Sequence, residues 1–125
     1  MRKILIVSSD KRLLTLLNRE LTIRNYTVLA EADPDKTFIH IGEFAPDMLV
    51  VDLILDEHNG GAISRQVKNN LHTNDLPIIV LSAYEPEIRY ASRFGCDRVI
   101  QKTGDFCPLI DAINDLLEEN ELVSS

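Results

Sequence analysis

The sequence lacks tryptophan, and it has no apolar run long enough to cross a lipid bilayer. A membrane-spanning helix needs about 20 consecutive apolar residues, so we do not expect an integral membrane protein. Basic residues are also few, because 13 Lys and Arg stand against 20 Asp and Glu for a net charge of -7. That balance argues against binding to nucleic acid or to an anionic membrane surface. The first apolar run is shorter than the about 7–15 residues of a secretory signal, and it predicts a buried strand instead.

Cysteine is scarce as well, with Cys96 and Cys107 as the two examples in the chain. Their spacing is not that of a C-x-x-C motif or of another common metal or redox site. We therefore expect two free thiols, small and buried, in the reducing environment of the cytoplasm. The length of 125 residues and the hydrophobic content of 45% suit one globular domain.

Five short apolar runs predict a parallel β-sheet. Each run is too short for a helix, is rich in Val, Ile or Leu, and lacks the polar alternation of a half-exposed strand. The runs are residues 4–7, 26–29, 48–51, 78–81 and 99–100. Between them, apolar residues recur at the three- and four-residue spacing of amphipathic helices. These positions are Leu14, Leu17 and Leu21, then Ile63, Val67 and Leu71, and finally Leu109, Ile113, Leu116 and Leu117.

The residues at the helix boundaries agree with this division. Asp33 precedes a proline and predicts the start of a helix that runs to about Phe44, while Gly95 suits the end of a helix over residues 87–94. Asp105 is expected to cap the last helix. The order (βα)5 predicts a doubly wound, flavodoxin-like α/β fold with a five-stranded parallel sheet of order 2-1-3-4-5. We expect residues 1–119 to form this domain and residues 120–125 to be a tail or the start of a linker.

In such sheets, ligands and chemistry gather at the C-terminal ends of the strands. The polar residues that follow the first, third, fourth and fifth runs are Ser8, Ser9 and Asp10, then Asp52, Ser82 and Lys102. Asp52 directly follows an apolar run, and a buried carboxylate needs a cationic or hydrogen-bonding partner. Lys102 is the partner that we expect.

These residues and their neighbours resemble, in order, the receiver domain of two-component response regulators from about Lys3 to Glu118. The matching segments are residues 46–52 before the phosphoacceptor position, Asn59-Gly60, residues 76–83 with their Ser-Ala ending, Gly95-Cys96-Asp97 and Lys102. The resemblance implies phosphoryl transfer from a histidine kinase to Asp52, with Ser82 and Lys102 contacting the phosphoryl group. It also implies a Mg²⁺ ion held by two acidic residues after the first strand.

The acidic pair of the family is missing here, because Ser8 and Ser9 occupy its positions. Asp10 comes one residue too late, and we expect it to cap the first helix, with metal binding as the weaker alternative. Hydroxyl groups are poor replacements for the anionic ligands of a hard dication, and Asp52 with Lys102 alone leaves the site neutral. The metal site is therefore predicted to be degenerate.

Three further positions depart from the family pattern. Val99 stands where an aromatic residue is common, Thr103 where a proline follows the lysine, and Asp56 where a proline follows the acceptor. The missing aromatic residue argues against the usual coupling between Ser82 and a switching ring. A run of Asp56, Glu57 and His58 offers a displaced metal site, although a solvated surface loop is the simpler interpretation.

The sequence therefore favours a degenerate receiver that acts as a protein-interaction module of a two-component or phosphorelay pathway, and not an enzyme. No bound cofactor is expected, and the partner would be a histidine kinase, a phosphotransfer protein, an effector or a second copy. The resemblance implies a partner surface made of the fourth helix, the fifth strand and the fifth helix, and the candidate interface residues are Tyr90, Arg93 and Val99. The main alternative is a working receiver that is phosphorylated on Asp52 and requires Mg²⁺. A flavodoxin-like flavin carrier is a third, remote hypothesis, since the loop after the first strand has no glycine.

Overall fold

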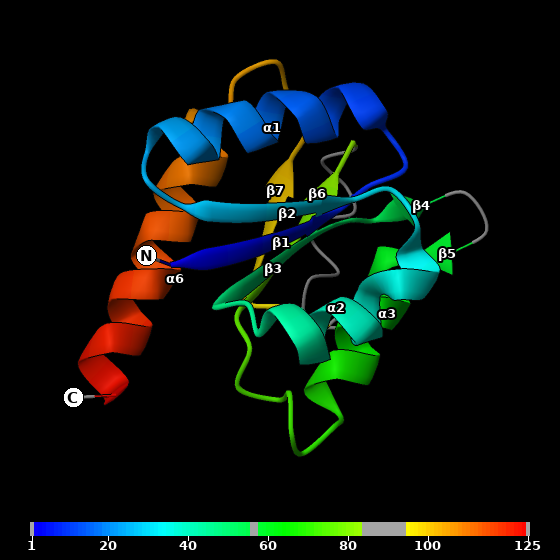
Figure 1. Cartoon of the computed structure of the whole chain (residues 1–125), viewed down its shortest axis with the longest axis vertical. Helices are drawn as coiled ribbons and strands as arrows, with labels where there is room; N and C mark the ends of the chain where they lie inside the picture. The colour runs from blue at the N-terminus through cyan, green and yellow to red at the C-terminus, as the bar shows by residue number, and fades with distance from the viewer. Residues whose placement is uncertain (1, 56–57, 84–94, 125) are drawn as a thin grey trace.

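The computed structural model describes residues 2–55, 58–83 and 95–124. Its centre is a five-stranded parallel sheet in the order β2-β1-β3-β6-β7 (Figure 1). The strands are β1 (Lys3–Val7), β2 (Thr27–Glu31), β3 (Met48–Asp52), β6 (Ile78–Ser82) and β7 (Arg98–Gln101). Counted among themselves, these strands have the order 2-1-3-4-5, which confirms the predicted fold class. A small antiparallel hairpin of β4 (Ile54–Leu55) and β5 (His58–Asn59) follows β3.

Helices cover both faces of the sheet (Figure 1). On one face lie α1 (Lys11–Ile23) and α6 (Cys107–Ser124), and on the other lie the short 3-10 helix η1 (Pro34–Lys36), α2 (Thr37–Phe44) and α3 (Gly60–Lys68). Successive strand residues pack into opposite cores. In β1, Ile4 and Ile6 contact the α1–α6 core, whereas Leu5 and Val7 contact the core under α3. Both faces of the strand are therefore buried, which explains the continuous apolar runs.

Most of the predicted helix boundaries are present. Asp10 Oδ1 accepts hydrogen bonds from the backbone N–H groups of Arg12 and Leu13, each 3.1 Å long, so Asp10 caps α1 as expected. Gly95 has the predicted left-handed conformation, with φ of 67°, although the helix predicted over residues 87–94 lies outside the described residues. The last helix, α6, runs to Ser124, so residues 120–124 are helical; where the domain ends stays a prediction.

Two expectations about side-chain burial are wrong. Leu71 does not belong to the apolar stripe of α3, because that helix ends at Lys68, and Leu71 is 87% exposed in the turn that follows. Cys107 is exposed in the first turn of α6, whereas Cys96 is half-buried and burial raises its pKa to about 11.

In the described part of the chain, no helix combines the length and the apolar character that crossing a membrane requires.

Candidate functional site

The register between β1 and β3 brings Ser8 next to Asp52. Val7 pairs with Val51, so the next residue of each strand emerges side by side at the C-terminal edge of the sheet. Both side chains are buried, with Ser8 0% and Asp52 2% exposed. The Ser8 hydroxyl donates a hydrogen bond of 2.7 Å to Oδ2 of Asp52 and accepts one from the backbone N–H of Asp10. One carboxylate oxygen of Asp52 is thus occupied by a neutral hydroxyl donor.

Lys102 approaches the other carboxylate oxygen. Its Nζ lies 2.9 Å from Asp52 Oδ1, so the expected ion pair is present. The two atoms are close, but Oδ1 has no hydrogen-bond partner of good geometry in the described residues, so the contact is electrostatic and misaligned. We regard the short distance as decisive for charge neutralisation, because Coulomb attraction depends on separation more than on angle. The buried carboxylate therefore has one cation and one hydroxyl as partners.

Ser82 ends the neighbouring strand β6 and is fully buried. Its carbonyl accepts a 2.6 Å hydrogen bond from the backbone N–H of Lys102, which fixes the start of the loop after β7. The ends of β3, β6 and β7 thus bring Asp52, Ser82 and Lys102 to one edge, as the sequence predicted. Their roles in phosphoryl chemistry stay predictions.

Among the described residues, the remaining candidate metal ligands do not complete a cation site. Ser9 is half-buried in the turn, and the Asp10 carboxylate is engaged in capping α1. Asp56 and Glu57 lie outside the described residues. Across the described ranges, no three His, Cys, Asp or Glu side chains gather as they would around a metal ion. A hard dication prefers several anionic oxygens, and Asp52 with two serines does not fit that requirement.

A glycine holds the loop after β3 against the site. A Cβ atom added at Gly60 would lie 2.0 Å from the backbone oxygen of Asp52, a distance that no side chain can tolerate. Gly60 also donates its N–H to the carbonyl of Leu53, and the side chain of Asn59 caps α3. The sequence shows an Asn-Gly pair here, but the close approach becomes visible only when β3 and α3 are packed.

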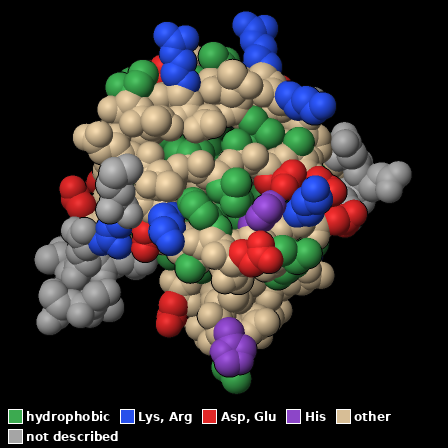
Figure 2. All heavy atoms as spheres, viewed as in Figure 1, with side chains coloured by type: hydrophobic (Ala, Val, Ile, Leu, Met, Phe, Trp, Pro, Cys, Tyr) green, Lys and Arg blue, Asp and Glu red, His purple; other side chains and the backbone are tan. Residues whose placement is uncertain are grey.

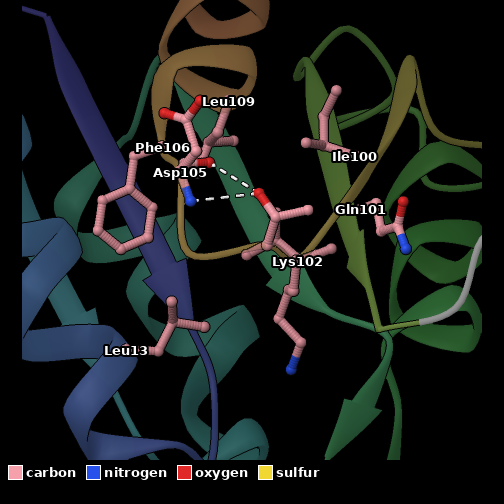
Figure 3. Close-up of a pocket in the computed structure, with 9 residues that line it drawn as sticks. Leu13, Ile100, Gln101, Lys102, Asp105, Phe106 and Leu109 are labelled. Carbon is pink, nitrogen blue, oxygen red and sulfur yellow. Dashed lines mark hydrogen bonds between the residues drawn. The ribbon is translucent and has the colours of Figure 1, made fainter.

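A small apolar pocket lies beside Lys102, between β7, the loop that follows and α6 (Figure 3). Its volume of about 20 Å³ has room for about one water molecule, which excludes a substrate-sized ligand. The Lys102 amine points away from Asp105 and Phe106 in Figure 3. Thr103, which replaces the family's proline, accepts from the backbone N–H of Asp105 and donates to its carbonyl.

The predicted interface residues are described only in part. Tyr90 and Arg93 lie outside the described residues. Val99 is half-buried in β7 and packs against the core under α3, so the domain itself covers part of this side chain. Sequence reasoning named Asp97 as part of the family pattern but missed its structural role: its Oδ2 accepts from the backbone N–H of Ile78 and from Lys68 Nζ. Its position directly before β7 is the signal that points to such a strand-bridging role.

The fold and this edge define a class: a doubly wound α/β domain with a buried carboxylate–lysine pair at the C-terminal end of its sheet. Comparison with known proteins gives the family. The response regulator receiver domain model matches residues 4–114. The chain is 32% identical to response regulator ArlR of Staphylococcus aureus over an alignment of 123 residues that covers 94% of this chain and 53% of that protein. It is 33% identical to response regulator MprA of Mycobacterium ulcerans over 81 residues, 65% of this chain and 34% of that protein.

Solved structures show the same fold. A response regulator receiver domain protein from Clostridium thermocellum has a TM-score of 0.87 at 20% identity and covers 98% of this chain and 99% of its own. Response regulator protein TrrA from Thermotoga maritima, solved with Mg²⁺ and BeF, has a TM-score of 0.84 at 21% identity, with 93% and 99% covered. This chain belongs to the response regulator receiver domain family. It spans about half the length of the curated relative ArlR, and less of MprA.

Proposed function

We propose that this receiver domain works as a protein-interaction module in the cytoplasm and that Mg²⁺-dependent phosphorylation of Asp52 is impaired. The observation that carries the proposal is the 2.7 Å hydrogen bond from Ser8 to Asp52. At the place where the family is expected to supply an anionic metal ligand, this chain supplies a hydroxyl that donates a hydrogen bond to the acceptor carboxylate.

The electrostatics of the site support the same conclusion. A metal-dependent phosphoacceptor needs a cation to offset repulsion between its carboxylate and the incoming phosphoryl oxygens. In the described part of the chain, Lys102 is the charge that faces Asp52, and it already neutralises that carboxylate. The Ser8–Asp52–Lys102 group is therefore proposed to be a structural unit that ties β1, β3 and the loop after β7 together.

Incubation with acetyl phosphate and Mg²⁺, followed by intact-mass measurement, tests the proposal. We expect no stable population heavier by one phosphoryl group. The matched control is Asp52→Asn, which should likewise show no population heavier by one phosphoryl group. A heavier population that disappears in Asp52→Asn would instead support the alternative, a receiver that is phosphorylated on Asp52 by a histidine kinase.

Restoring the acidic pair tests whether Ser8 and Ser9, and not the other departures from the family pattern, impair phosphorylation. The double variant Ser8→Asp with Ser9→Asp should gain Mg²⁺ binding, measured by calorimetry, together with modification of Asp52 by acetyl phosphate. If the restored variant binds Mg²⁺ but stays unmodified, the defect lies elsewhere, and Val99 and Thr103 are the next positions to restore. Absence of both effects would show that the two serines are not the reason for the loss.

The partner is proposed to be a histidine kinase, a phosphotransfer protein or an effector domain. The surface proposed for that contact contains Tyr90, Arg93 and the exposed part of Val99, as the family resemblance implies. Alanine at Tyr90 and Arg93 should weaken association with a partner once one is identified, whereas unchanged binding would count against this surface.

A further inference from the structure

Helix α1 presents a stripe of alternating basic and apolar residues to solvent. Arg12, Leu16, Arg19 and Ile23 follow the spacing i, i+4, i+7 and i+11, which places them on one side of the helix. This side lies opposite the buried stripe of Leu14, Leu17 and Leu21. The apolar members are large and accessible, with Leu16 38% and Ile23 65% exposed. Basic side chains stand along the edge of the molecule where α1 lies (Figure 2).

The α1 stripe is basic, whereas the chain as a whole is acidic. Within α1 there are three basic residues and one acidic residue, although the whole chain carries -7. Helix α6 is the opposite case, with five acidic residues and no basic one over Cys107–Ser124. Its exposed residues Asp111, Asp115 and Glu118 recur at i, i+4 and i+7, on the side opposite its buried apolar residues. The chain therefore carries a basic helix and an acidic helix.

The two helices pack on the same face of the sheet, and both contribute to one core. Their charged stripes point outward, away from that core, so they do not neutralise one another within the domain. None of Arg12, Arg19, Asp111, Asp115 and Glu118 takes part in an ion pair with another described residue. One face of the molecule thus presents a basic stripe and an acidic stripe that form no ion pair with each other.

We propose that this α1–α6 face is an interface between two copies of this chain, in which each α1 lies on the α6 of the partner. A two-fold axis produces each contact twice. Helix α1 of the first copy contacts α6 of the second, and α1 of the second copy contacts α6 of the first. Arg12 and Arg19 then face the acidic stripe of α6, and Leu16 and Ile23 are removed from water.

The second copy is the occupant because the chain itself supplies both halves of the contact. A foreign acidic helix would fit α1 alone and would leave the acidic stripe of α6 without a counterpart. The basic half of the α1–α6 face, helix α1, is not part of the surface proposed for contact with a kinase, a phosphotransfer protein or an effector. The interface needs no chemistry at Asp52, so this proposal stands or falls independently of the proposed function.

The test measures association by sedimentation velocity over a wide range of protein concentrations. The unmodified chain should form a dimer that weakens as salt is added, since the contacts are between exposed charges. Two variants reverse one stripe each: Arg12→Glu with Arg19→Glu on α1, and Asp111→Arg with Asp115→Arg on α6. In a dimer of either variant, both α1–α6 contacts join helices of like charge. The dissociation constant of that dimer should therefore rise by at least about tenfold.

An equimolar mixture of the two variants is the decisive measurement. In the mixed dimer, the reversed α1 meets the reversed α6, and the native α1 meets the native α6, so both contacts are again complementary. Recovery of dimer in the mixture also shows that both variants are folded. A control with Lys36→Glu and Gln66→Glu, exposed positions on the opposite face, should associate like the unmodified chain.

Three outcomes would overturn the proposal. The first is a chain that stays monomeric at every concentration, as expected if α1 instead receives an acidic helix from another protein. The second is a dimer that neither charge reversal weakens. The third is a mixture that fails to associate although both variants are folded by circular dichroism.

Discussion

Ser8 and Ser64 are both fully buried, but their hydroxyl groups have different surroundings. The Ser8 hydroxyl donates to the carboxylate of Asp52, whereas the Ser64 hydroxyl in α3 has no hydrogen-bond partner among the described residues. A hydrogen bond to a charged group is worth more than one between neutral groups, and a buried hydroxyl without a partner costs free energy. The same chemical group is thus expected to stabilise the fold at one position and to destabilise it at the other.

Alanine at each serine tests this contrast. Ser8→Ala removes a donor from a buried carboxylate and should lower the free energy of unfolding by about 1–3 kcal/mol. Ser64→Ala removes only an unsatisfied polar group and should raise that free energy by up to about 1 kcal/mol. Urea denaturation of both variants measures the two values. Changes of the same sign would contradict the hydrogen-bond assignment at Asp52.

At the scale of elements, the start of α3 packs closely against the end of β3. The chain leaves β3 at Asp52, turns through β4 and β5, and returns so that Gly60 touches the Asp52 backbone. Gly42 in α2 is the natural comparison, because a Cβ atom there would meet nothing within 4 Å. Both glycines lie in helices, so they differ in the room that is available for a side chain.

Substitution of these glycines should therefore have opposite effects. Gly60→Ala forces the backbone of α3 away from Asp52 and should lower the free energy of unfolding by more than about 2 kcal/mol. Gly42→Ala should raise it by about 0.5–1 kcal/mol, because alanine restricts the unfolded chain and favours a helix. Thermal and urea denaturation can compare the two. Equal tolerance at both positions would show that β3 and α3 are not so closely packed.

At the scale of the whole molecule, the Glu31–His40 pair joins the end of edge strand β2 to α2. His40 Nε2 lies 2.7 Å from Glu31 Oε1, and the other carboxylate oxygen accepts from the backbone N–H of Asp33. Burial of the Glu31 carboxyl opposes its ionisation, but the Asp33 and His40 contacts outweigh this and hold its pKa below the usual 4.5. The ionised form of Glu31 is therefore favoured in the folded state.

This lowered pKa predicts how stability changes in acid. A carboxyl whose pKa is lower in the folded state contributes stability above its unfolded pKa and loses it as the pH falls through the folded value. Glu31→Gln should therefore be less stable than the unmodified chain near neutral pH, and the difference should shrink below pH 4.5. Urea denaturation at several pH values measures this, with exposed Glu43→Gln as the control. A difference independent of pH would contradict the contribution of the ionised carboxylate.

Local patterns were sufficient to predict much of the fold. The central strands β1, β3 and β6 are buried and have continuous apolar runs because both faces of the sheet are covered, and this pattern is visible in a short window of sequence. The caps at Asp10 and Asp105 are equally local, since a capping side chain bonds to backbone groups two or three residues away. The end of α3 was misjudged, because Leu71 continues the apolar spacing although the helix has already ended.

The sequence by itself determined that this chain is a doubly wound α/β domain with Asp52 and Lys102 at strand ends, because strand burial and strand-end position are properties of short segments. Only the tertiary structure decided that Ser8 donates to Asp52, that Gly60 must be a glycine and that two oppositely charged helices share one face. Those facts depend on the register and packing of elements that are distant in the chain. The contacts between these elements depend on how the strands pair and how the helices pack on the sheet, and a short window of sequence contains neither.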